Sequence, residues 1–144
     1  MKKLAVAAVL VGCAALIAHL HASTQTYHPV IKISAPGGVD YTVVLDATGD
    51  RPACASAGKS FVAPMRAQCP DCEIVSARCE RELHDLELAL ERGRPVSLYT
   101  VSMAGVRVAI TAEDARAKAA CNVIAGVAVR EGAPGASCIL PHSR

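Results

Sequence analysis

Short runs of β-branched residues alternate with amphipathic segments along most of the chain. Two runs, 30–34 and 41–46, are separated by Ala-Pro-Gly-Gly, which predicts a β-hairpin. Two more runs, 96–101 and 106–110, flank a Met-Ala-Gly turn and predict a second hairpin. The apolar stretch 72–75 predicts one further short, buried strand.

Two helices are predicted between these hairpins. Asp50 is a suitable N-cap for the first, which we expect to end near Val62, because Pro64 breaks or kinks a helix. Ser76 can cap the second helix. The apolar residues of this second helix recur at helical spacing and are Leu83, Leu86 and Leu90.

A third helix is predicted after the second hairpin. Thr111 with Asp114 three residues later resembles a capping box. The apolar stripe that follows consists of Ala117, Cys121, Ile124 and Ala128. Residues 132–137 are expected to form a loop. The order ββ-α-β-α-ββ-α predicts an α+β fold, in which three helices cover one face of a small mixed sheet built from two β-hairpins and one short strand. Alternation in the 106–110 strand predicts that the other face is wet.

The beginning of the chain has a different pattern. Two lysines at 2–3 precede an almost unbroken apolar run, Leu4–Leu20, as in the n-region and h-region of an export signal. We expect residues 1–22 to be either a signal peptide cleaved after Ala22 or an N-terminal membrane anchor. At about 1.5 Å per residue the run would span roughly 25 Å, slightly less than the ~30 Å hydrocarbon core of a bilayer.

A third interpretation of the leader is lipidation. The segment Leu-Val-Gly-Cys ending at Cys13 looks like a bacterial lipobox, which would make Cys13 the lipidated residue. Residues 23–29 are polar and are expected to form a tether, and residues 30–144 a single exported domain. This domain would be periplasmic or otherwise extracytoplasmic, and it would contact the membrane through the leader if the leader is uncleaved or lipidated.

Charge and aromatic content argue against several ligand classes. The chain has 15 Lys and Arg against 13 Asp and Glu, and without the two leader lysines the counts are equal. A neutral domain gives no electrostatic reason to expect nucleic acid or anionic lipid as a partner. The aromatic residues, which could stack on bases or sugars, are few: Tyr27, Tyr41, Phe61 and Tyr99. We therefore expect no nucleic-acid partner.

Six of the seven cysteines fall in the predicted domain; they are Cys54, Cys69, Cys72, Cys79, Cys121 and Cys138. An even number of cysteines behind an export signal predicts a disulfide framework. Cys121 with Cys138 is the preferred local pair, because it would tie the last helix to a Gly- and Pro-rich tail. Closing such a loop stabilises a domain by about 3 kcal/mol. The other four cysteines would supply two more bridges, whose pairing the sequence leaves open.

The segment Cys69-Pro70-Asp71-Cys72 has a reactive interpretation. Its Cys-x-x-Cys spacing, with a proline between the cysteines, resembles that of thioredoxin-like proteins, which implies thiol–disulfide exchange. In that family the motif opens a helix whose N-terminus stabilises the thiolate. Here it follows a predicted helix and opens a predicted strand. We favour a structural disulfide and keep redox catalysis by this pair as the alternative.

Two other groups of residues have a ligand-binding interpretation. Cys69, Cys72, Cys79 and His84 have the spacing of a zinc ligand set, but oxidation after export competes with metal binding. The second group lies between a strand end and a helix start, where α/β proteins often bind ligands, and it consists of Asp46, Thr48 and Asp50. A turn at Gly49 and an N-cap account for this second group without a ligand.

These patterns predict no catalytic residue, no metal and no cofactor. Our interpretation is a non-catalytic exported envelope protein, which binds another envelope protein as an accessory component of a membrane-associated system. The Lys-Lys leader and the Ala- and Arg-rich composition are typical of bacteria. The alternatives are a thiol–disulfide oxidoreductase that uses Cys69 and Cys72, or a module that binds a small ligand or a metal.

Overall fold

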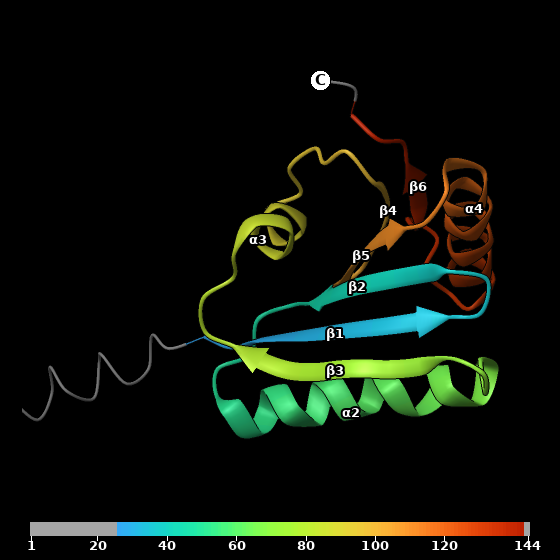
Figure 1. Cartoon of the computed structure of the whole chain (residues 1–144). Coiled ribbons are helices and arrows are strands. Elements are labelled where there is room, and N and C mark those ends of the chain that lie inside the picture. The colour runs from blue at the N-terminus through green and yellow to red at the C-terminus, as the bar shows by residue number, and fades with distance from the viewer. Residues whose placement is uncertain (1–25, 143–144) are drawn as a thin grey trace, which may run out of the picture.

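The computed structural model describes residues 26–142, which form one antiparallel sheet with helices on both faces (Figure 1). The predicted leader, residues 1–22, with Cys13 in it, lies outside the described residues. The elements in chain order are β1 (His28–Ala35), β2 (Val39–Leu45), α2 (Arg51–Gln68), β3 (Glu73–Glu80), α3 (Asp85–Glu91), β4 (Tyr99–Met103), β5 (Val106–Thr111), α4 (Asp114–Arg130) and β6 (Ser137–Ile139). None of the helices within residues 26–142 is long and apolar enough to cross a membrane.

The strand order across the sheet is β3-β1-β2-β5-β4-β6, so β3 and β6 are its two edges. This arrangement confirms the predicted α+β class, with two hairpins and, among the described residues, three helices. The predicted mixed sheet is wrong in one respect, because every neighbouring pair of strands is antiparallel. Strand β6 was not predicted; it has only three residues and lies in the expected loop and tail.

The first hairpin, β1–β2, runs in register from Val30 opposite Val44 to Ala35 opposite Val39. Gly37 in its turn has a φ of 83°, a left-handed conformation that costs glycine little. β1 begins at His28, two residues before the expected start of the domain. Part of the expected tether therefore pairs within the sheet.

Helix α2 extends further than the sequence predicts. It continues through Pro64 to Gln68. A proline removes one helical hydrogen bond, but here the last turn is held by other contacts. Met65 packs against the core, and the backbone N–H of Cys69 donates to the carbonyl of Met65.

The second predicted helix begins later than expected. Ser76 is not its cap but lies within β3, and α3 begins at Asp85. The reason is the sheet: residues 73–80 pair with β1, with one register shift, and this pairing outweighs the local preference of Ser76 for a helix N-cap. Leu83 and Leu90, predicted on one helix face, do lie in the same buried cluster.

The predicted capping box before the third helix is also wrong. Thr111 is the last residue of β5, Glu113 is the N-cap of α4, and no side-chain hydrogen bond caps this helix. The predicted apolar stripe is largely correct, since Ala117 and Cys121 are buried, but the next buried position is Ala125.

The core lies on both faces of the sheet. Helices α2 and α4 cover one face, where the largest buried side chains include Ile31 and Ile110. Helix α3 covers part of the other face, where Val30 and Ala109 are buried with Leu83. The expectation that all helices cover one face is therefore wrong. The sheet face predicted to be exposed to solvent is partly apolar, because the leucines of α3 pack against it.

Candidate functional site

The six cysteines of the described residues form three disulfides, which confirms the predicted framework. The pairs are Cys54–Cys79, Cys69–Cys72 and Cys121–Cys138. The last is the pair that the sequence favoured. It joins the buried face of α4 to β6 and so holds a three-residue edge strand in place.

Two of these disulfides lie at the two ends of α2 and β3. Cys54 is completely buried in the first turns of α2, and its partner Cys79 lies near the end of β3. Asp50 fixes the start of this helix, because its carboxylate accepts a 2.7 Å hydrogen bond from the N–H of Ala53. Cys69 and Cys72 span the short connection between α2 and β3. Figure 1 shows α2 running along β3 between these two ends.

Between α2 and β3 lies an open groove of about 490 Å³, called here the α2–β3 groove. Its lining residues are Cys54, Ala55, Gly58, Lys59, Val62, Ala63, Arg66, Ile74, Ala77, Arg78 and Cys79. Most of them are small or apolar. The charged residues among them are all cations: Lys59, Arg66 and Arg78. Of these, Arg78 lies 3.2 Å from the carboxylate of Glu80, in an exposed pair. The groove therefore has an apolar floor and a positive rim.

The outer edge of β3 borders this groove. β3 has eight residues and pairs only with β1, so within the described residues its other edge has no partner strand. Such an edge presents unpaired backbone N–H and C=O groups that can pair with another chain. Val75 on this strand is 60% exposed, so a large apolar side chain is accessible beside this edge. The opposite edge, β6, is much shorter.

The Cys69–Cys72 disulfide lies in a partly exposed turn. Cys69 is the C-cap of α2, and the N–H of Cys72 donates to the carbonyl of Cys69 at 3.1 Å. A helix C-terminus carries partial negative charge, which disfavours a thiolate there. The order of helix, motif and strand is the one that the sequence predicts, and it is opposite to that of thioredoxin-like proteins.

The structure does not assemble the possible zinc ligand set, because Cys79 is bonded to Cys54 and Cys69 to Cys72. His84 stands exposed at the N-cap of α3. Within residues 26–142, no group of three or more His, Cys, Asp or Glu side chains could hold a metal ion.

The Asp46–Asp50 segment has a structural role. The hydroxyl of Thr48 donates to the carbonyl of Tyr27 at 3.1 Å, and the backbones of these two residues form a β-bridge. Asp50 is the N-cap of α2, as predicted. Within the predicted group, these contacts engage the Thr48 hydroxyl and the Asp50 carboxylate.

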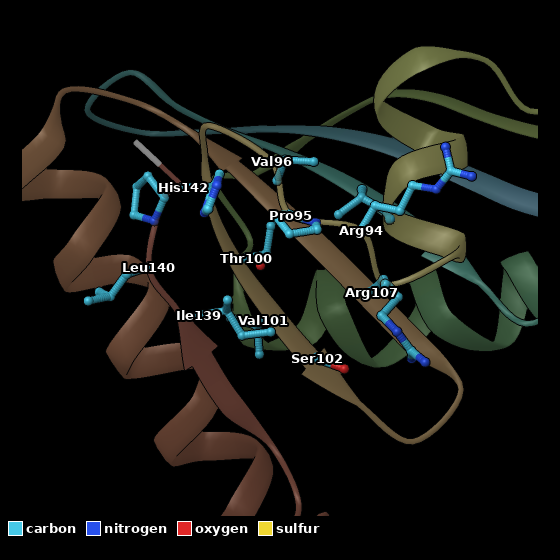
Figure 2. Close-up of a pocket in the computed structure, with 13 residues that line it drawn as sticks. Arg94, Pro95, Val96, Thr100, Val101, Ser102, Arg107, Ile139, Leu140 and His142 are labelled. Carbon is cyan, nitrogen blue, oxygen red and sulfur yellow. The ribbon is translucent and has the colours of Figure 1, made fainter. Parts of the chain in front are cut away.

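A second cavity, of about 260 Å³, lies on the α3 face of the sheet, beside β4 and the C-terminal segment (Figure 2). Arg94, Arg107 and His142 are among its lining residues. This cavity was not predicted from the sequence, because its lining residues come from four separate segments. The one hint in the sequence was Arg107, a cationic residue between two valines of a predicted strand.

Comparison of the chain with protein-family models, with curated proteins and with solved structures finds no match.

Proposed function

We propose that this protein is a non-catalytic, exported component of the cell envelope that binds an extended segment of a partner protein along β3. The observation that supports this proposal is the long outer edge of β3 beside the α2–β3 groove, which no other strand of residues 26–142 pairs with. An extended segment would add a strand to the sheet through backbone hydrogen bonds, and every second side chain would reach the groove.

The groove limits the chemistry of the partner segment. Its apolar floor suits small or β-branched apolar side chains. Lys59 and Arg66 on the rim suit carboxylates, because electrostatic complementarity speeds association and disfavours cationic competitors. The partner segment is therefore an extended stretch in which apolar residues alternate with Asp or Glu.

The two disulfides at the ends of the groove support a binding role. They limit the relative movement of α2 and β3, so that little ordering entropy is lost when a partner binds. Three disulfides also indicate an oxidising, extracytoplasmic environment. Together with the leader expected at residues 1–22, they support a periplasmic location, with attachment to the membrane if the leader is uncleaved or lipidated.

A thiol–disulfide oxidoreductase is the second candidate. The observation in its favour is that neither Cys69 nor Cys72 is buried, whereas each of the other two disulfides contains a fully buried cysteine. The position at a helix C-terminus opposes it, as described above. If the pair is catalytic, the purified protein accelerates disulfide exchange in a reduced substrate protein, and C69S/C72S abolishes this activity. We expect no acceleration by either form.

Site-specific photocrosslinking in intact cells tests the binding proposal. A photoreactive amino acid replaces Val75 on the free edge of β3, and the matched control replaces Val123 on α4, which is similarly exposed at 64%. We expect one dominant partner adduct from position 75 and none from position 123. Mass spectrometry of the adduct should locate the crosslink in a segment of alternating apolar and acidic residues. Equal crosslinking from both positions, or none from position 75, would contradict the proposal.

A further inference from the structure

The cavity on the α3 face has a chemical character that the proposed function does not use. Its walls come from the end of α3, the loop after it, β4, β5 and the C-terminal segment. Figure 2 shows Arg94 and Arg107 towards one side of the cavity and Ile139, Leu140 and His142 towards the other. The cavity thus has a cationic end and an opposite end that is mainly apolar.

At the cationic end, Arg107 is held in place by the backbone. Its Nη1 atom donates to the carbonyl of Met103 at 3.0 Å and to that of Val106 at 3.3 Å. The side chain is only partly exposed. Among residues 26–142, no carboxylate lies within ion-pair distance of Arg107 or of Arg94. A fixed, partly buried guanidinium with unused N–H donors is a preorganised site for an oxyanion.

Two hydroxyl-bearing residues of β4 line the same cavity. Ser102 is the register partner of Arg107 across the β4–β5 ladder, and both residues line the cavity. Thr100, two residues earlier on β4, also lines it and is almost fully buried. Figure 2 shows both hydroxyl-bearing side chains on β4 between the two ends. These hydroxyls can donate to the same oxyanion or to a polar atom beside it.

At the apolar end, the C-terminal segment forms a wall. The N–H of His142 donates to the carbonyl of Val96 at 2.9 Å, which ties this segment to the loop before β4. Ile139 and Leu140 are 47% and 65% exposed, so apolar surface is available here. A ligand with a short alkyl body would cover part of it.

We propose that this cavity binds a small amphiphilic oxyanion, with a carboxylate or phosphate group at Arg94 and Arg107 and a short alkyl body lying towards Ile139. The volume of about 260 Å³ restricts the body to a short chain, since drug-sized ligands occupy roughly 300–1,000 Å³. Because this cavity and the α2–β3 groove have no lining residue in common, the site is independent of the proposed partner interface.

An NMR titration of the isotope-labelled protein, as isolated from cells, tests this site. The probes are hexanoate, hexan-1-ol and inorganic phosphate. We expect saturable amide shifts on β4 and residues 139–142 with hexanoate, and at least tenfold weaker binding of the other two compounds. Loss of the oxyanion removes the charge-assisted hydrogen bonds, and loss of the alkyl body removes the apolar contact.

Three variants complete the experiment. Arg94→Gln should weaken hexanoate binding about tenfold or more, and no side-chain hydrogen bond of the described structure is lost with it. Arg107→Lys keeps the positive charge but removes the planar guanidinium group with its several N–H donors. It should weaken hexanoate binding to a similar extent. The control Arg51→Gln, on an exposed arginine at the start of α2, should leave affinity within twofold. Hexan-1-ol or phosphate binding as tightly as hexanoate, no saturable shift, or an equal effect of Arg51→Gln would overturn the proposal.

Discussion

Cys54 on α2 and Cys79 on β3 are joined by a disulfide, with their Cα atoms 6.0 Å apart. The short segment that connects α2 to β3 contains the second disulfide, Cys69–Cys72. The helix and the edge strand are thus clamped at both ends. The groove between them is a fixed feature of the surface, and its geometry depends on these two bonds.

The two clamps should contribute unequally to stability. In the chain-entropy model, closing the longer Cys54–Cys79 loop is worth about 3–4 kcal/mol and closing the Cys69–Cys72 loop about 2 kcal/mol. We expect C54A/C79A to lower the free energy of unfolding by more than C69A/C72A does, as measured by urea denaturation. The difference should be larger than the model gives, because alanine at the buried position 54 also leaves a cavity. Equal losses would show that the long clamp is not the main constraint.

Gly58 in α2 should tolerate a side chain. A Cβ at this position would lie 4.0 Å from the Cβ of Pro29, an ordinary van der Waals contact, and the backbone is helical. We therefore expect Gly58→Ala to raise the free energy of unfolding by about 0.5–1 kcal/mol. Gly38→Ala is the contrasting variant, because Gly38 has a φ of 73° in the β1–β2 turn and alanine would be strained there. A decrease in stability with Gly58→Ala would contradict this prediction, because it would mean that a Cβ at position 58 is crowded by its neighbours.

Reversal of the rim charges should weaken partner binding without unfolding the protein. K59E/R66E places two carboxylates beside the groove, where we expect acidic residues of the partner. The yield of the partner adduct from a photoreactive residue at position 75 should fall about tenfold, and the loss should shrink at high salt. The control is Lys118→Glu, at an exposed lysine on α4, and it should leave the yield unchanged. An unaltered yield with K59E/R66E would show that the rim does not recognise the partner.

Ionisation of the Tyr99 hydroxyl should make the protein less stable at high pH. Burial of this side chain in β4 raises the pKa of its hydroxyl, and the nearby Asp114 carboxylate raises it further. A group whose pKa is higher in the folded state stabilises the fold below its unfolded value, about 10 for tyrosine, and this contribution is lost as pH rises through the folded value. Tyr99→Phe should therefore show a smaller loss of stability between pH 9 and 11 in urea titrations. Identical pH profiles for the two proteins would contradict this assignment. Part of the loss should remain, because burial also raises the pKa of Tyr41.

Much of the fold is predictable from local pattern. The two hairpins follow from β-branched runs around glycine turns, and the start of α2 follows from Asp50 before an alanine-rich segment. The errors arise where pairing across the sheet outweighs local preference. Ser76 is a suitable N-cap residue ahead of a leucine pattern with helical spacing, yet its own segment pairs with β1. Ser137–Ile139 is too short to recognise, and it becomes a strand because Cys138 is tied to Cys121.

The candidate sites are less predictable than the fold. The even cysteine count indicates disulfides, but the Cys54–Cys79 pairing depends on how α2 returns along β3. The positive rim is equally hard to recognise in the sequence. Lys59 and Arg78 come from different elements, and the domain as a whole has balanced charge. The position of β3 at the edge of the sheet, where no second strand of the described chain pairs with it, follows from the strand order, which no local pattern determines.

Amide hydrogen exchange on the complex with the crosslinked partner segment tests the central claim most directly. If the segment adds a strand to β3, those β3 amides that do not pair with β1 should become protected by at least tenfold. The amides of β6, the other edge of the sheet, should be unaffected. Protection at β6 or on α4 instead of β3, or no protection at either edge, would contradict strand addition as the mode of binding.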